Sequence, residues 1–289
     1  MRNTKMKKIY QLIVFTTLLT TVVSCTDTNT VVNLGEKPIV EAYLAPGHRV
    51  SMKVYTEIPY AETSEGVSEP INGLSIKITG SNGKVFILKS EGNGVYTSAD
   101  NELIQEPPVK YKMEFDYKGR TISAETDIPE KPVGMAISTN EISRSQVNLS
   151  SGGFPGGGGG GFGGFDNTPI ELSWSNPDNV YHFIALENTE TEPVQIIIPP
   201  SGSEFPTIRF RISNEPVLGT HSNIQPQSLE YFGNYDVILY RINPDYSALY
   251  QSSGTTTQNL STPPSSITNG LGIFTGINAD TLKLLVKKN

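Results

Sequence analysis

The stretch YKMEFDYKGRTISAET, residues 111–126, decides the fold class. Apolar and polar side chains alternate through its first seven residues, as in a strand that buries one face. Lys118 and Gly119 then form a tight turn, and residues 121–126 provide the returning strand. The stretch is therefore predicted to be an antiparallel β-hairpin.

The same pattern extends from this hairpin towards the N-terminus. Short extended runs separated by turn residues recur roughly every 8–12 residues, a spacing typical of β-sandwiches. The predicted strands cover residues 38–44, 50–55, 74–78, 85–88 and 95–96. Pro129 and Pro132 end the segment. We predict an immunoglobulin-like sandwich over residues 36–131.

On the C-terminal side of the hairpin, residues 132–289 are predicted to form a second sandwich. A strand that ends at Trp174, a turn that contains Pro177 and a strand that begins at Tyr181 are similar to the early strands of a fibronectin type III domain. Trp174 is the only tryptophan and is expected in the core. Further strands are predicted at residues 195–198, 207–212, 235–240 and 282–286.

One short helix is predicted after the strand at 235–240. Asn243 is a good N-cap, Pro244 suits the first helical position, and Asp245 favours the positive end of the helix dipole. Gly254 can end the helix. The predicted fold is thus all-β, with two tandem antiparallel sandwiches and one helix near the C-terminus.

The first 24 residues have the layout of a lipoprotein signal peptide. Arg2, Lys5, Lys7 and Lys8 precede an uncharged, mostly apolar run over residues 9–23. Val22, Val23, Ser24 and Cys25 look like a bacterial lipobox, in which cleavage precedes the cysteine and acyl chains anchor it to a membrane. The alternative is an ordinary cysteine near the end of a leader.

Cleavage at this position changes the predicted charge of the protein. Loss of the four basic residues of the leader takes the net charge from −7 to −11. Residues 25–35 are then expected to form a tether between the lipid and the first sandwich.

Two segments have biased composition. Residues 150–165 contain ten of the 27 glycines, interspersed with Phe154, Phe162 and Phe165, and are predicted to be a flexible insertion or a sticky arm for a partner. Residues 252–268 are rich in Ser, Thr and Pro and are expected to form a loop.

The composition argues against nucleic-acid binding and against metal or cofactor chemistry. No basic stretch accompanies the acidic net charge. His48, His182 and His221 are not spaced as zinc ligands, and the single cysteine excludes a cysteine-based zinc site. His182 lies in a predicted strand and is expected to contact solvent or a domain seam. We expect no catalytic residue, metal or cofactor.

Acidic pairs such as Glu190/Glu192 and Asp100/Glu102 fall in predicted turns. A solvated loop is the simpler interpretation of both pairs. A glycosidase remains an alternative, because its two carboxylates can come from any part of a chain.

Aromatic residues near the helix are the candidate contacts for a ligand or a partner. They are Tyr231, Phe232, Tyr246 and Tyr250, within a cluster that also contains Tyr235 and Tyr240. Tyrosine rings suit glycan stacking and protein interfaces. The alternative is that these rings pack the helix against the sheet.

Several motifs together resemble a known family, the lipoproteins of Bacteroidota catalogued as domain of unknown function 4249. The motifs are Cys25, the opening strand at 38–44, Gly94-Val95-Tyr96, residues 117–129, residues 232–237 and the Asn/Gly-rich ending at 268–276. The poly-Gly insertion departs from the family pattern. The resemblance implies an outer-membrane lipoprotein, commonly encoded beside TonB-dependent transporters, and implies no activity.

The leading hypothesis is a non-enzymatic lipoprotein of the outer membrane that assists a TonB-dependent transporter by protein contact or ligand capture. The membrane face, periplasmic or surface-exposed, stays open. The alternatives are a surface glycan-binding lipoprotein, a structural or adhesion protein, and a hydrolase with dispersed acids.

Overall fold

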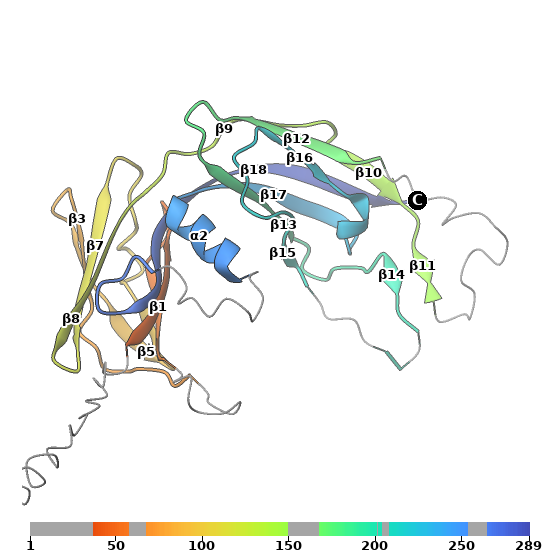
Figure 1. Ribbon diagram of the computed structural model, residues 1–289. Helices are drawn as coiled ribbons and strands as arrows, with labels where there is room; N and C mark the ends of the chain where they lie inside the picture. Colours follow the sequence, from red (N-terminus) through yellow and green to blue (C-terminus); the bar gives the residue numbers. More distant parts are fainter. Residues whose placement is uncertain (1–36, 58–67, 150–167, 201, 204–207, 254–264) are drawn as a thin grey trace, which may run out of the picture. The chain divides into compact units, whose positions relative to one another are not determined.

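A computed structural model describes residues 37–57, 68–149, 168–200, 202–203, 208–253 and 265–289 (Figure 1). The predicted signal peptide (1–24), the lipobox residues with Cys25, and the tether (25–35) lie outside the described residues. The Gly-rich insertion and residues 254–264 of the predicted loop at 252–268 lie outside them as well.

The first sandwich packs two sheets around one apolar core. One sheet has the order β18-β1-β2-β6-β5, and the other has the order β4-β3-β7-β8. The strands are β1 (Pro38–Leu44), β2 (Ser51–Thr56), β3 (Lys77–Gly80), β4 (Val85–Ile87), β5 (Lys89–Gly92), β6 (Val95–Thr97), β7 (Lys110–Tyr117) and β8 (Arg120–Asp127).

The hairpin predicted at residues 111–126 is confirmed as β7 and β8. Tyr111, Met113 and Phe115 are buried, whereas the residues between them point outwards, as the alternation predicted. Lys118 and Gly119 have φ values of 48° and 76°. Positive φ at both central residues matches the twist of a two-residue hairpin turn.

The second sandwich also has two main sheets. One is β15-β13-β17-β18, with β10 added to β18, and the other is β16-β12-β9. The strands are β9 (Val133–Ile137), β10 (Glu141–Arg144), β11 (Val147–Asn148), β12 (Ile170–Ser175), β13 (Tyr181–Asn188), β14 (Ile197–Ile198), β15 (Phe210–Ile212), β16 (His221–Ile224), β17 (Gly233–Ile242) and β18 (Leu271–Lys288). A 3-10 helix, η2, covers Pro226–Ser228.

Strand β18 belongs to both sandwiches. Residues 271–276 pair in parallel with β1, and residues 277–286 pair antiparallel with β17. The prediction of a short last strand at 282–286 was therefore too narrow. The expected assignment of all of residues 132–289 to the second sandwich also fails at 271–276, because these residues complete a sheet of the first.

The predicted helix is confirmed as α2 (Pro244–Ser253). The Tyr246 ring packs on Phe183 of β13. Phe183, Ala185 and Ile242 form a small core on the face of the β13–β17 sheet that points away from the sandwich interior. The face of the sheet that does not look into the sandwich is thus partly covered by α2 (Figure 1). At ten residues, α2 needs such packing for stability.

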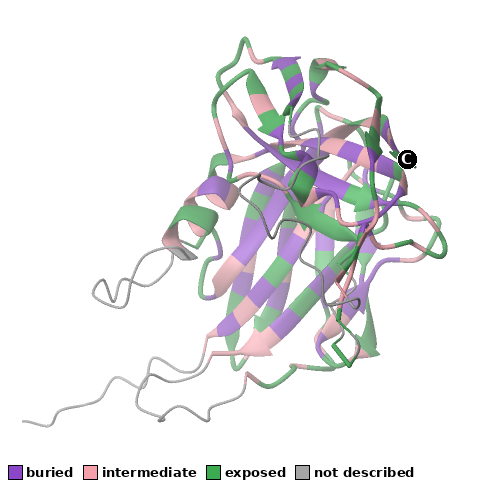
Figure 2. Cartoon of the chain, turned by 90° about the vertical axis from the view of Figure 1, so that its right-hand side faces the viewer, coloured by how far each residue is buried: buried purple, intermediate pink, exposed green. Residues whose placement is uncertain are grey.

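The buried residues form one core in each sandwich, and strand burial alternates along most strands (Figure 2). Trp174 is only 4% exposed, which confirms its predicted place in the core. Within the described residues, no helix has both the length and the apolar composition to cross a bilayer. The all-β prediction with two sandwiches is confirmed, except that the β1–β18, β10–β18 and β11–β14 pairs are parallel.

Candidate functional site

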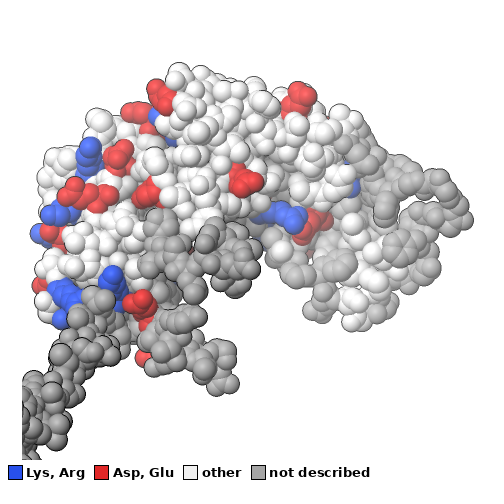
Figure 3. Space-filling model, viewed as in Figure 1, with Lys and Arg blue, Asp and Glu red and all other residues white. Residues whose placement is uncertain are grey.

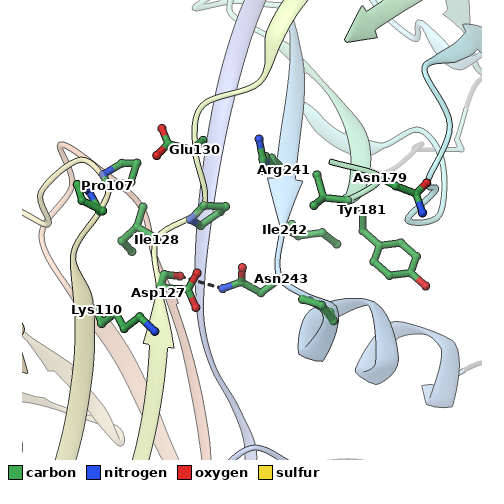
Figure 4. Close-up of a pocket in the computed structure, with 14 residues that line it drawn as sticks. Pro107, Lys110, Asp127, Ile128, Glu130, Asn179, Tyr181, Arg241, Ile242 and Asn243 are labelled. Atoms are coloured by element: carbon green, nitrogen blue, oxygen red, sulfur yellow. Dashed lines mark hydrogen bonds between the residues drawn. The ribbon is translucent and has the colours of Figure 1, made fainter. Parts of the chain in front are cut away.

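A pocket of about 370 Å³ lies where the end of β8 meets the end of β17 (Figure 4). The first sandwich contributes Lys110, Asp127 and the Pro107–Pro108 turn, and the second contributes Tyr181 and Arg241. The proline rings and Ile128 and Ile242 give it apolar walls, and charged side chains surround its rim.

Hydrogen bonds from two amide side chains hold together the segments around this pocket. Asn243 Nδ2 donates to Thr126 Oγ1 at 3.1 Å and to the Asp127 carbonyl oxygen at 2.9 Å. Asn278 Nδ2 donates to the Pro129 carbonyl oxygen at 2.9 Å. The Gly276 N–H donates to Thr126 Oγ1 at 2.9 Å. These bonds join β18 and the residue before α2 to the end of β8 and to the segment that follows it, both of which contribute residues to the pocket.

The charged groups around the pocket are poorly placed for acid–base catalysis. Arg241 pairs with Asp178 at 3.0 Å. Lys110, Asp127 and Glu130 are exposed. A carboxyl group that acts as a general acid at neutral pH is usually desolvated by burial, and neither Asp127 nor Glu130 meets that condition.

Two of the four aromatic residues predicted to contact a ligand or a partner are buried. Tyr231 is 2% exposed and Phe232 is 7% exposed. Tyr231 is held by Tyr235, whose hydroxyl accepts the Tyr231 N–H at 2.8 Å and donates to the Tyr231 carbonyl oxygen at 3.1 Å. The prediction that Tyr231 and Phe232 reach a ligand is therefore wrong, because both rings fill the core of the second sandwich.

Tyr246 and Tyr250 lie on α2 with different surroundings. Tyr246 stacks on Phe183 with ring centroids 5.5 Å apart and meets Tyr43 edge-on at 5.7 Å. Its ring packs the helix against the sheet, which was the alternative interpretation of this cluster. Tyr250 is 37% exposed and is the one residue of the four that is classed as exposed.

The three histidines lie far from a shared site. His48 and His221 are exposed, whereas His182 is 1% exposed and packs beside Trp174. The expectation that His182 contacts solvent or a domain seam is wrong, because its strand face looks into the core. Burial lowers the pKa of His182 to about 4. Among the described residues, no three His, Cys, Asp or Glu side chains converge as metal ligands.

The acidic residues predicted in turns have structural contacts. Glu190 Oε1 accepts the Asn234 N–H and Nδ2, both at 2.8 Å, and these bonds lower the pKa of Glu190. Asp100 pairs with Arg49 at 2.7 Å on the surface. Basic and acidic side chains are interspersed over the face shown in Figure 3.

Sequence reasoning missed the pocket and an exposed apolar strand. Residues 207–212 were predicted as a strand, but nothing in the sequence shows that its apolar side stays uncovered. In β15, Phe210 is 46% exposed and Ile212 is 41% exposed. The signal for the pocket was the pair of proline-rich turns at 107–108 and 129, whose convergence depends on the tertiary fold.

Comparisons with known proteins give one family and a number of distant structural likenesses. The chain resembles a two fibronectin type III domain segment from chicken tenascin, with 10% identity over 87% of this chain and 99% of the other and a TM-score of 0.24. It also resembles protocadherin gamma B2 extracellular cadherin domains 3–6, with 12% identity over 88% of this chain and 51% of the other and a TM-score of 0.19.

Among curated proteins, none matches the chain significantly. The sequence profile described as "Domain of unknown function (DUF4249)" matches residues 28–283, nearly all of the chain that follows the predicted leader. The chain therefore belongs to the DUF4249 family.

Proposed function

We propose that this protein is a non-enzymatic lipoprotein of the outer membrane, anchored through acyl chains on Cys25, that assists a TonB-dependent transporter. The observation that carries the proposal is the position of the only cysteine, which directly follows Val22-Val23-Ser24 at the end of an apolar leader. Multiple acyl chains anchor a protein stably, since each buried methylene contributes about 0.8 kcal/mol.

The features of the described residues favour contact with a partner over chemistry. The pocket between the sandwiches has exposed carboxylates, and the apolar side of β15 is open to solvent. Exposed apolar surface of this kind commonly marks a site of protein interaction. It is also the observation that favours a structural or adhesion role as the second candidate.

Glycan binding is weakened as a candidate. It was motivated by Tyr231 and Phe232 as exposed stacking platforms, and both are buried. Of the four predicted contact residues, only Tyr250 keeps an exposed ring on which a sugar could stack.

Replacing Cys25 by alanine tests the anchor. The variant is expected to move from the membrane pellet to the soluble fraction, because the acyl chains on Cys25 are the proposed anchor and, within the described residues, no helix is long and apolar enough to cross a bilayer. Fractionation followed by immunoblotting measures this, with Ser24→Ala as the matched control that keeps the acylated residue. Continued retention of the Cys25→Ala variant in the pellet would refute the lipid anchor.

Purification of the lipidated protein from detergent-solubilised outer membranes tests the proposed role. We expect a TonB-dependent transporter to co-purify in stoichiometric amount, as identified by mass spectrometry. A preparation that contains the lipoprotein but no such transporter argues for the structural or adhesion role instead.

A further inference from the structure

The edge strand β15 has an arrangement that suits the addition of another strand. It pairs with β13 on one side only and ends the sheet order β15-β13-β17-β18 (Figure 1). Within the described residues, no strand pairs with its other side. An unpaired strand edge presents backbone donors and acceptors to any extended chain that approaches it.

The hydrogen bonds to β13 show which backbone groups face outwards. The Asn188 N–H donates to the Arg209 carbonyl oxygen at 2.8 Å, and the Ser213 N–H donates to the Ile184 carbonyl oxygen at 2.7 Å. Residues 209, 211 and 213 thus direct their backbone groups towards β13. Since these groups alternate along an antiparallel strand, those of Phe210 and Ile212 point to the free side.

The side chains of the same two residues form an apolar stripe. Phe210 and Ile212 stand opposite Glu187 and Ala185, and Ile208 precedes them in the period-two pattern. They are exposed by 46%, 41% and 46%, respectively. Free backbone groups and apolar side chains therefore occur at the same residues.

The other face of β15 is basic. Arg209 and Arg211 alternate with the apolar residues. The Arg211 side chain is 48% exposed and forms an ion pair with Glu230, with 3.1 Å between Arg211 Nη1 and Glu230 Oε1. Antiparallel pairing of β15 with a second copy of itself, centred on Phe210 or on Arg211, would place Arg211 opposite Arg209 or opposite Arg211. Like charges directly opposite each other destabilise a sheet, so the edge is better suited to a strand with acidic residues on that face.

The edge strand at the other end of the large sheet differs from β15 in its composition and in the regularity of its pairing. Strand β5 is polar (Lys89, Ser90, Glu91) and carries a register shift between Ser90 and Gly92. Polar residues and bulges are devices that prevent strand addition. Strand β15 has no register shift, and the basic residues Arg209 and Arg211 lie on one face only, so that the other face remains apolar.

We propose that the free edge of β15 binds an extended segment of a protein partner in which apolar residues alternate with acidic ones. The segment adds to the sheet as a further strand, with its apolar side chains along Ile208, Phe210 and Ile212 and its acidic ones beside Arg209 and Arg211. This inference rests on the proposed role in protein contact and supplies the binding surface.

The test uses the full lipidated protein in detergent and a fluorescent decapeptide in which valine and glutamate alternate. Fluorescence anisotropy is expected to show saturable binding, and a peptide with proline at two central positions is expected not to bind. A valine–lysine peptide is expected to bind at least tenfold more weakly. A Phe210→Thr/Ile212→Thr variant is expected to lose at least tenfold in affinity for the valine–glutamate peptide, because threonine keeps the strand but removes the apolar stripe.

The matched control is Val85→Thr/Ile87→Thr on the edge strand β4, where the side chains are 44% and 59% exposed. This variant is expected to bind as the unchanged protein does. Equal weakening by both variants, equal binding of the lysine peptide, or no binding at all would overturn the proposal. So would a dimer in sedimentation analysis that the Phe210→Thr/Ile212→Thr variant abolishes, because the occupant would then be a second copy.

Failure of the proposed strand addition at β15 is distinguishable from failure of the proposed accessory role. A transporter that co-purifies equally well with the Phe210→Thr/Ile212→Thr variant would overturn the β15 surface and leave the accessory role intact. A transporter that never co-purifies would count against the role itself.

Discussion

Replacing Gly272 by alanine is expected to destabilise residues 37–289 by about 4 kcal/mol. Gly272 has a φ of +94°, and a Cβ built there lies 2.1 Å from the Val40 carbonyl oxygen. A side chain in such a backbone conformation costs about 1–3 kcal/mol, and forcing atoms into a packed site costs about 1–3 kcal/mol more. Gly272 lies in the parallel pairing of β18 with β1, so the substitution disrupts the attachment of β18 to a sheet of the first sandwich.

Urea unfolding followed by tryptophan fluorescence and circular dichroism measures this loss. Gly47→Ala is the matched control, because Gly47 has a φ of +75° but nothing within 4 Å of a built Cβ. That variant carries the conformational cost alone and is expected to lose about 1 kcal/mol. If both variants lose the same stability, the close approach of the two strands is not what requires glycine at position 272.

Acidification from pH 7 to pH 4 is expected to remove about 3 kcal/mol of stability through His182. Burial, with a smaller contribution from the positive charge of Arg241, lowers the pKa of His182 to about 4 from its ordinary value near 6.5. The unfolded chain therefore binds a proton below about pH 6.5 that the folded chain does not bind. The contribution of His182 to the free energy of unfolding is fully present above that pH and is lost as the pH drops towards 4.

The measurement is the free energy of unfolding at half-unit pH steps for the unchanged protein and for His182→Gln. The variant is expected to be less stable at pH 7 but to have a flatter profile between pH 6.5 and 4. Glu114 and Glu190 also have lowered pKa values and add acid sensitivity to both proteins, so the difference between the profiles is the informative quantity. His48→Gln, at an exposed site, should leave the profile unchanged. Parallel profiles for His182→Gln and the unchanged protein would contradict the account.

Local signals in the sequence predicted the local structure well. The hairpin of β7 and β8 follows from strict alternation and a Lys-Gly turn, and α2 begins at Pro244 directly after the predicted cap, Asn243. Both features depend on residues that are neighbours in the chain. Trp174 was likewise predicted correctly, because a large aromatic residue in an alternating strand has few places other than the core.

Features that depend on distant partners were not predictable. The length of β18 arises because one strand changes partner from β1 to β17, and neither partner is visible from residues 271–288 alone. The composition around Tyr231 showed an aromatic cluster, but only the tertiary structure shows that this ring and that of Phe232 point inwards. The exposed stripe on β15 has the same origin, because alternation predicts one apolar face and does not say what covers it.

The double membership of β18 determines when this protein can finish folding. The strand that completes the first sandwich follows β1 by most of the length of residues 37–289, so β1 has no neighbour on that side until residues 271–276 have been synthesised. Long-range pairing of this kind slows folding and prolongs the exposure of an open sheet edge. Until that pairing forms, the open edge of β1 in a nascent or truncated chain is exposed to aggregation.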